Sequence, residues 1–351
     1  MRRTDPLLLD TTRKILRAVA DPQARHGGDG PARRAAAWRA IEDSGLTRAW
    51  LAEALGGAGA SAADGFAILT LAGEVALDVP LAETLLAGWL LAEVGLSAPD
   101  GALAPPPGGD GISLDGGRLR GRVPSVPFAR EAGHLVVLAR RADGEGVVAL
   151  VERAACTVEP RDNLAGEPRD LVVLDGTAPV ATAAAPDSLG ERALAMGAVA
   201  RSCQMAGALQ AILARSVTYA GERVAFDRPI GKFQAIQHAL ARLAGETAAA
   251  LAASGSAADA LADPACDAGG LLLEVAGAKI RVGEAAAAGA AVAHQVHGAI
   301  GFSTEHALHR FTRRLWAWRD DFGSETAWAV RLGSWVAARG ADALWPVVAA
   351  R

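Results

Sequence analysis

Four of the seven histidines in this chain fall between positions 294 and 309. His306 and His309 lie three residues apart, a spacing at which one face of a helix can offer two imidazoles to a metal ion. No cysteine and no Glu-x-x-His element accompanies this cluster, which also contains His294 and His297. We therefore expect no metal site here.

Two adjacent carboxylates, Asp320 and Asp321, could remove a proton from a substrate held within hydrogen-bond reach. The alternative is that they form ion pairs with arginines of the same segment. These arginines are Arg313, Arg314 and Arg319. Ser202 and Cys203 lie on a predicted helix without the sharp turn that exposes a nucleophile, so covalent catalysis is disfavoured.

Two short motifs, about sixty residues apart, carry the most specific information. The first consists of Arg223, Phe226 and Gln234, and the second is Gln295-Val-His-Gly298-Ala299-Ile-Gly301. Taken singly, each residue has an ordinary explanation as a solvated arginine, a core phenylalanine, a surface glutamine or a helix stop. Together, in this order and spacing, they resemble the C-terminal helical domain of the acyl-CoA dehydrogenase family.

The resemblance implies that FAD is the cofactor and that a neighbouring subunit provides most of its binding site. Arg223 would pair with the pyrophosphate, because a guanidinium is a fixed and permanently charged fork. Phe226 would pack on the cofactor, and two glutamines would supply amide groups. The small residues of the second motif would let the backbone approach the phosphates. The cofactor-binding residues are therefore Arg223, Phe226, Gln234, Gln295, Gly298 and Ala299, in a dimer or a dimer of dimers.

In the resembled family a carboxylate removes the proton α to the thioester of an acyl-CoA, a hydride leaves the β carbon for the flavin, and an electron-transfer flavoprotein takes the electrons. The base is usually a Glu before a Gly-Thr-Ser turn. Here an ungapped match places Phe322 at that position, and a shift of one residue places Asp321 there. The second base position used by some members falls near Gly197. Asp321 is thus the candidate catalytic residue, although its side chain is one methylene short of Glu and a misplacement of about 1 Å can cost roughly a hundredfold in rate.

The segments that contact the isoalloxazine ring in most members are absent. Ser125 and Pro127 stand where a Trp and a Thr are usual, and proline has no amide donor. Three hypotheses remain: a self-sufficient homo-oligomer that uses Asp321, a base-lacking subunit of a heterotetramer with a second acyl-CoA dehydrogenase, and a scaffold that has lost the cofactor. The second resembles bacterial enzymes that degrade sterol side chains and other bulky acyl groups.

Three zones of different periodicity must position these residues. Apolar residues recur at helical spacing over residues 1–98, with Ser61 or Asp64 as a cap after a glycine-rich loop. Short apolar runs separated by turns follow over residues 99–186 and predict an antiparallel sheet or small barrel. Long helices return over residues 187–351. The predicted fold class is α+β, with an N-terminal helical domain, a middle β domain and a C-terminal four-helix bundle, as in the resembled family.

Composition narrows the class of protein further. Lys and Arg number 35 against 39 Asp and Glu, without long runs of one sign, so nucleic-acid binding is not expected. Three widely spaced cysteines argue against a disulfide framework and favour a reducing cytoplasm. The apolar run near the N-terminus is too short for a signal peptide, and we expect no membrane span.

Overall fold

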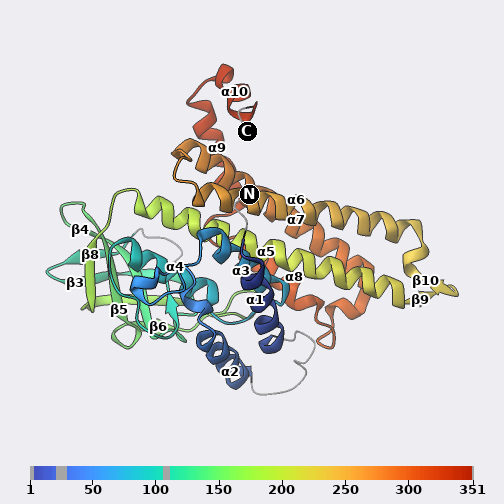
Figure 1. The fold of residues 1–351 in the computed structure, drawn as a ribbon, viewed down its shortest axis with the longest axis horizontal. Coiled ribbons are helices and arrows are strands. Elements are labelled where there is room, and N and C mark those ends of the chain that lie inside the picture. The colour runs from blue at the N-terminus through green and yellow to red at the C-terminus, as the bar shows by residue number, and fades with distance from the viewer. Residues whose placement is uncertain (1–3, 21–29, 106–110, 350–351) are drawn as a thin grey trace.

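The computed structural model describes residues 4–20, 30–105 and 111–349. Helices at the N-terminus are followed by one sheet and then by a second set of much longer helices (Figure 1). The N-terminal helices are α1 (Pro6–Val19), α2 (Gly30–Asp43), α3 (Ala62–Glu74) and α4 (Leu81–Glu93). The predicted cap of α3 is confirmed as a capping box: the Ser61 hydroxyl accepts a hydrogen bond from the Asp64 amide, and the Asp64 carboxylate accepts one from the Ser61 amide.

The sheet has eight strands, and its main path runs in the order β6-β7-β3-β2-β4-β5-β8. The strands are β1 (Leu103–Ala104), β2 (Ser113–Asp115), β3 (Arg118–Pro127), β4 (His134–Arg141), β5 (Gly146–Glu152), β6 (Thr157–Glu159), β7 (Arg169–Thr177) and β8 (Ala181–Ala184). Among these strands the pairings are antiparallel except that β4 pairs in parallel with β1 and β2. The sheet is therefore mixed at this point, a detail that turn signals in the sequence do not reveal.

Strands β4 and β5 are buried on both faces. Val137 and Val147 face one apolar cluster inside the sheet, while their neighbours Val136 and Val148 pack with Leu90 of α4. This double burial explains why both strands are continuous apolar runs rather than alternating ones. It also places one face of the sheet directly against the N-terminal helices.

The C-terminal helices are α5 (Leu189–Glu222), α6 (Gln234–Ala262), α7 (Ala268–His297), α8 (Leu308–Trp318), α9 (Glu325–Ala337) and α10 (Leu344–Ala349). Helices α5, α6 and α7 run side by side away from the sheet, and α9 with α10 projects from the body (Figure 1). None of the described helices is long and apolar enough to cross a membrane.

Helices α3 and α5 touch through their backbones. A Cβ atom at Gly73 would lie 2.0 Å from the carbonyl oxygen of Gln204, and one at Gly207 would lie 1.9 Å from that of Thr70. Each glycine therefore admits the opposite helix where any side chain would collide. This contact joins the N-terminal helices to the long bundle in one apolar core.

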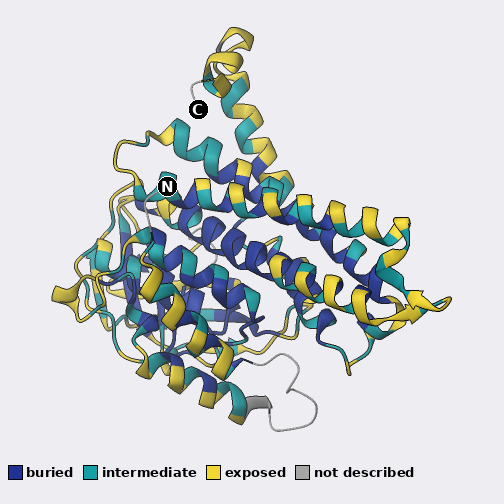
Figure 2. Cartoon of the chain, turned by 45° about the vertical axis from the view of Figure 1, so that its right-hand side comes forward, coloured by how far each residue is buried: buried dark blue, intermediate teal, exposed yellow. Residues whose placement is uncertain are grey.

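The far end of the bundle carries a small hairpin. Strands β9 (Val224–Ala225) and β10 (Arg228–Pro229) pair in antiparallel register around a two-residue turn. Both turn residues, Phe226 and Asp227, have positive φ values of 52° and 60°. We call this end of the bundle the tip. Figure 2 shows that exposure increases towards it.

Candidate functional site

The position where the family base is expected is occupied by an aromatic ring. Phe322 is buried in the loop between α8 and α9, with a φ of 56°. Its carbonyl oxygen accepts a hydrogen bond from Nε1 of Trp328 at 2.9 Å. A Cβ atom at Gly197 would lie 2.2 Å from Cδ1 of Phe322. The structure thus brings the base position of the ungapped match into contact with the second base position, and neither of these two residues carries a carboxylate.

Asp321, the candidate base, is held by arginines of two other parts of the chain. Its Oδ2 accepts hydrogen bonds from Arg169 of β7 at 2.6 Å and from Nε of Arg201 of α5 at 2.8 Å. Arg201 also pairs with the buried Glu83 of α4 and donates to Gln204 at 2.5 Å. Burial disfavours the charged form of Arg201, but Glu83 and Asp321 more than offset this and raise its pKa.

The alternative in which the two acids pair with arginines of their own segment does not hold for Asp321. Arg314 instead pairs with Glu167 at 2.8 Å, and Arg319 pairs with Glu325 at 2.6 Å. Asp320 is exposed, whereas the Asp321 side chain is only 16% exposed. The two neighbouring carboxylates therefore occupy different environments.

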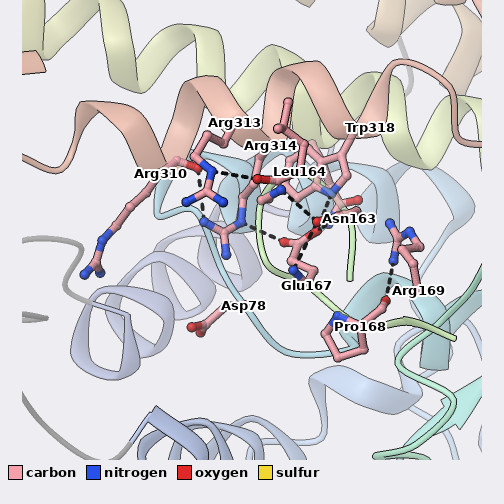
Figure 3. Close-up of polar contacts among 12 residues, drawn as sticks. Asp78, Asn163, Leu164, Glu167, Pro168, Arg169, Arg310, Arg313, Arg314 and Trp318 are labelled. Carbon is pink, nitrogen blue, oxygen red and sulfur yellow. Dashed lines mark hydrogen bonds and ion pairs between the residues drawn. The ribbon is translucent and has the colours of Figure 1, made fainter. Parts of the chain in front are cut away.

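A second buried carboxylate, Glu167, lies beside this network on the loop between β6 and β7. Figure 3 shows that Arg314 and the indole of Trp318, both from α8, point toward Glu167. Nε1 of Trp318 donates a hydrogen bond to the Glu167 carboxylate at 3.0 Å, and the side-chain amide of Asn163 donates another at 3.0 Å. Burial alone would raise the pKa of Glu167, but Arg314 and then Arg169 outweigh burial and hold this pKa below its ordinary value.

Lys279 of α7 holds the end of α8. Its buried ammonium group donates to the carbonyl oxygen of Arg319 at 2.7 Å and to that of Trp318 at 3.4 Å. Burial lowers the pKa of Lys279 to about 8, although Asp321 and Glu325 act in the opposite direction. This side chain therefore fixes the start of the loop that carries Asp321 and Phe322.

An apolar cavity of about 260 Å³ opens beside Phe322. Its walls come from α4, from β4 and β5 and from the start of α5. Apolar lining residues include Leu86, Trp89, Leu138 and Leu194, while Arg140 and Glu191 add charge. The cavity is therefore mainly apolar, with charged groups on part of its wall.

All six predicted cofactor-binding residues gather at the tip. Helix α5 ends and α6 begins there, and the antiparallel α7 returns to the same end. Arg223 follows α5, Gln234 opens α6 and Gln295 lies in the last turn of α7. All six residues are exposed: Arg223, Phe226, Gln234, Gln295, Gly298 and Ala299.

The tip fits the nucleotide end of FAD. Gly298 has a φ of 64° and a ψ of −146°, and a Cβ atom there would meet nothing within 4 Å. A guanidinium, two carboxamides and an unobstructed backbone are suited to phosphates. Phe226 is 89% exposed at the end of the hairpin. Because all these groups point to solvent, they fit a cofactor held by another molecule.

The residues around the expected isoalloxazine site do not fit the flavin ring in the way that the tip fits the nucleotide end. Ser125 has a φ of 59°, and β3 changes register between Val123 and Val126. Pro127 pairs with Arg169 in the β3–β7 ladder and has no amide hydrogen. Arg169 and Arg201, which the sequence leaves unconnected, both donate to Asp321 nearby. Arg169 and Arg201 could not be identified from the sequence, because no local spacing links them to Asp321.

The histidine cluster forms a packed aromatic group. The ring of His297 stacks on Tyr219 with centroids 4.5 Å apart, and Nε2 of His294 lies 2.9 Å from the Thr312 hydroxyl. Burial, with His297 and Arg215 nearby, lowers the pKa of His306 to about 4. Within the described ranges no three His, Cys, Asp or Glu side chains are arranged to hold a metal ion.

Comparison with known proteins identifies the family of this chain. Residues 189–319 match the profile of the acyl-CoA dehydrogenase C-terminal domain. The chain is 30% identical over 319 residues to the acyl-CoA dehydrogenase IpdE2 of Mycobacterium tuberculosis, covering 86% of this chain and 90% of that protein.

Two solved structures share the whole fold. The ChsE4-ChsE5 complex from Mycobacterium tuberculosis contains a chain with a TM-score of 0.81 and 24% identity, covering 95% of this chain and 98% of that one. The Tcur3481-Tcur3483 steroid acyl-CoA dehydrogenase gives a TM-score of 0.82 and 25% identity, with 95% and 97% covered. By sequence and by fold, the chain belongs to the acyl-CoA dehydrogenase family.

Proposed function

We propose that this chain is the base-lacking subunit of a heteromeric acyl-CoA dehydrogenase. It would support FAD-dependent α,β-dehydrogenation of an acyl-CoA thioester, with the catalytic glutamate supplied by a second, different subunit. As in the family, an electron-transfer flavoprotein would take the electrons. The free cysteines suit a reducing cytoplasm.

The exposed aromatic at the tip carries the proposal. Phe226 is 89% exposed and adopts a backbone conformation that non-glycine residues rarely take. Val224, two residues before it, is also exposed. A strained, apolar and cationic surface of this kind is explained by a contact that the isolated chain does not make.

The buried residues around Phe322 and Asp321 also support a catalytic base supplied by a second subunit. Phe322 packs on Gly197 where a base would be needed, and Asp321 is engaged by Arg169 and Arg201 through one oxygen. A carboxylate in two ion pairs is poorly placed to reach a substrate proton. The base must then come from elsewhere in the assembly.

FAD, when bound, supplies the acceptor for the hydride that leaves the acyl β carbon. The residues of this chain bind and orient. Arg223 would neutralise the pyrophosphate, and Gln234 with Gln295 would hold the polar edges of the nucleotide. Gly298 would admit the phosphates against the backbone. Because the related Tcur3481-Tcur3483 protein is a steroid acyl-CoA dehydrogenase, a steroid acyl-CoA is the first substrate to test.

The visible spectrum tests this proposal. The chain should be colourless when purified alone, and a yellow complex that an acyl-CoA bleaches should appear on coexpression with a glutamate-bearing acyl-CoA dehydrogenase encoded beside it. Arg223→Gln should weaken FAD retention by about tenfold or more, since a charged hydrogen bond is lost. Arg122→Gln, an exposed change on β3, should leave FAD retention unchanged.

Two other functions give different outcomes. A yellow protein that an acyl-CoA bleaches without any partner would establish a complete enzyme, and Asp321→Asn would then abolish bleaching. A protein that stays colourless with every partner would point to a scaffold that has lost the cofactor.

A further inference from the structure

A concave surface rich in arginine lies apart from both the tip and the apolar cavity. It has a volume of about 210 Å³ and lies between α2, the loop after α3, the β6–β7 loop and α8. It shares no lining residue with the cavity beside Phe322. We call it the arginine pocket. Its charged and polar lining side chains are Arg33, Arg34, Asp78, Glu167, His309, Arg310, Arg313 and Arg314.

Among the described lining residues, guanidinium groups outnumber carboxylates by five to two. Arg33 lies 3.5 Å from Asp78, and Arg314 pairs with Glu167 at 2.8 Å. Nε of Arg313 donates to the backbone oxygen of Leu164 at 2.6 Å, and no carboxylate of the described chain pairs with it. Figure 3 shows Arg313 and Arg314 beside the β6–β7 loop, whereas Arg310 extends from α8 away from that loop. The charge of Arg313 is therefore left without a carboxylate partner within the described ranges.

Two lining arginines also retain unused donors. The Nε atoms of Arg33 and Arg34 are buried and have no hydrogen-bond acceptor within the described part of the chain. Arg34 uses a terminal nitrogen for Glu131 at 2.7 Å, so this ion pair does not satisfy its Nε. Buried donors without acceptors are rare in proteins and often indicate an ion or water that completes the site.

We propose that the arginine pocket binds a phosphate group, presented as inorganic phosphate or as the phosphomonoester of a nucleotide. A tetrahedral dianion offers several acceptor oxygens at once, and the planar forks of Arg33 and Arg313 reach it from two different elements. Burial lowers the pKa of His309, and Arg310 and Arg313 act in the same direction. The arginines therefore supply the positive charge that binds the phosphate.

The test is a titration of the whole chain with inorganic phosphate at constant ionic strength, followed by phosphorus NMR and equilibrium dialysis. One saturable site is expected. Arg313→Gln and Arg33→Gln should each raise the dissociation constant by about tenfold or more. The matched control is Arg122→Gln, whose side chain is 66% exposed on β3, and it should bind phosphate like the unaltered chain.

A competition experiment separates the two sources of phosphate. Displacement of inorganic phosphate by coenzyme A but not by dephospho-coenzyme A would identify the 3′-phosphate as the ligand, whereas displacement by neither would identify the inorganic ion. Non-saturable binding, or equal losses in Arg33→Gln and in the control, would overturn the proposal. If Arg313→Gln does not fold, as judged by circular dichroism, Arg33→Gln decides, because its side chain is 38% exposed.

Discussion

Gly197 packs so closely against the ring of Phe322 that no side chain fits at position 197. Gly197→Ala would place a methyl group 2.2 Å from the Phe322 ring. We expect a loss of about 1–3 kcal/mol in the free energy of unfolding, measured by urea denaturation. Phe322→Leu in the same chain should recover part of this loss, because it removes the colliding ring.

Gly245 of α6 provides the control, since a Cβ atom there would meet nothing within 4 Å. Gly245→Ala should stabilise the chain by about 0.5–1 kcal/mol through helix propensity. If Gly197→Ala were equally stabilising, the close packing of Phe322 on α5 would be refuted.

Replacing Asp321 tests whether this carboxylate has a structural role or a catalytic one. Asp321→Asn keeps an acceptor for Arg169 and Arg201 but removes the charge that balances them. We expect the free energy of unfolding to fall by about 2–3 kcal/mol. The bleaching rate per folded heteromer should stay within about twofold, whereas loss of the base would reduce it by orders of magnitude.

At the scale of the element, a substitution in the turn of the β9–β10 hairpin should affect the stability of the chain and its binding of FAD in opposite directions. Phe226→Gly removes an exposed ring and relieves a positive φ, so the isolated chain should gain up to about 1 kcal/mol of stability. The same change should weaken FAD retention in the heteromer.

Asp227→Gly is the matched variant, because it relieves the neighbouring positive φ of 60° and keeps the ring of Phe226. It should stabilise the chain similarly and leave FAD retention intact. Equal FAD retention in both variants would remove Phe226 from the binding surface. Thermal denaturation and the bound flavin per heteromer are the two measurements.

The link between α7 and the end of α8 should depend on pH through Lys279. Its pKa is about 8 in the folded chain against 10.5 for an ordinary lysine. Between these values the unfolded chain binds more protons, so this group costs stability below pH ~8 and the cost disappears as the pH rises to ~10.5. Relative to Lys279→Met, the unaltered chain should gain up to about 3 kcal/mol over that window in urea denaturation. A constant difference across it would contradict the buried position of the ammonium group.

At the scale of the whole molecule, one buried network joins all three zones of the chain. Glu83 comes from the N-terminal helices, Arg169 from the sheet, and Arg201 with Asp321 from the C-terminal helices. Arg201→Leu would leave Glu83 buried without its partner. We expect a loss of about 3–5 kcal/mol, seen by both far-UV and near-UV circular dichroism in one shared transition. Separate transitions for helices and sheet would contradict this coupling.

How much the sequence reveals depends on whether the relevant contacts are local. The cap at Ser61 and the strand runs follow from local spacing along the chain, and the fold class was predicted correctly. The tip residues were identified through the family resemblance of two motifs, and their role in binding FAD stays a prediction. The environment of Asp321 could not be predicted, because its partners lie 120 and 152 residues away on other elements. The donors of the arginine pocket likewise converge from helices separated by the entire sheet.

The backbone contact of α3 with α5 fixes the lengths of the segments that lead to it. Gly73 lies a set number of turns after the cap at Ser61, and Gly207 a set number after the start of α5. A single inserted residue would rotate either helix by about 100° and turn a side chain into the opposite backbone. We expect the spans 61–73 and 189–207 to tolerate substitutions at many positions but no insertion or deletion.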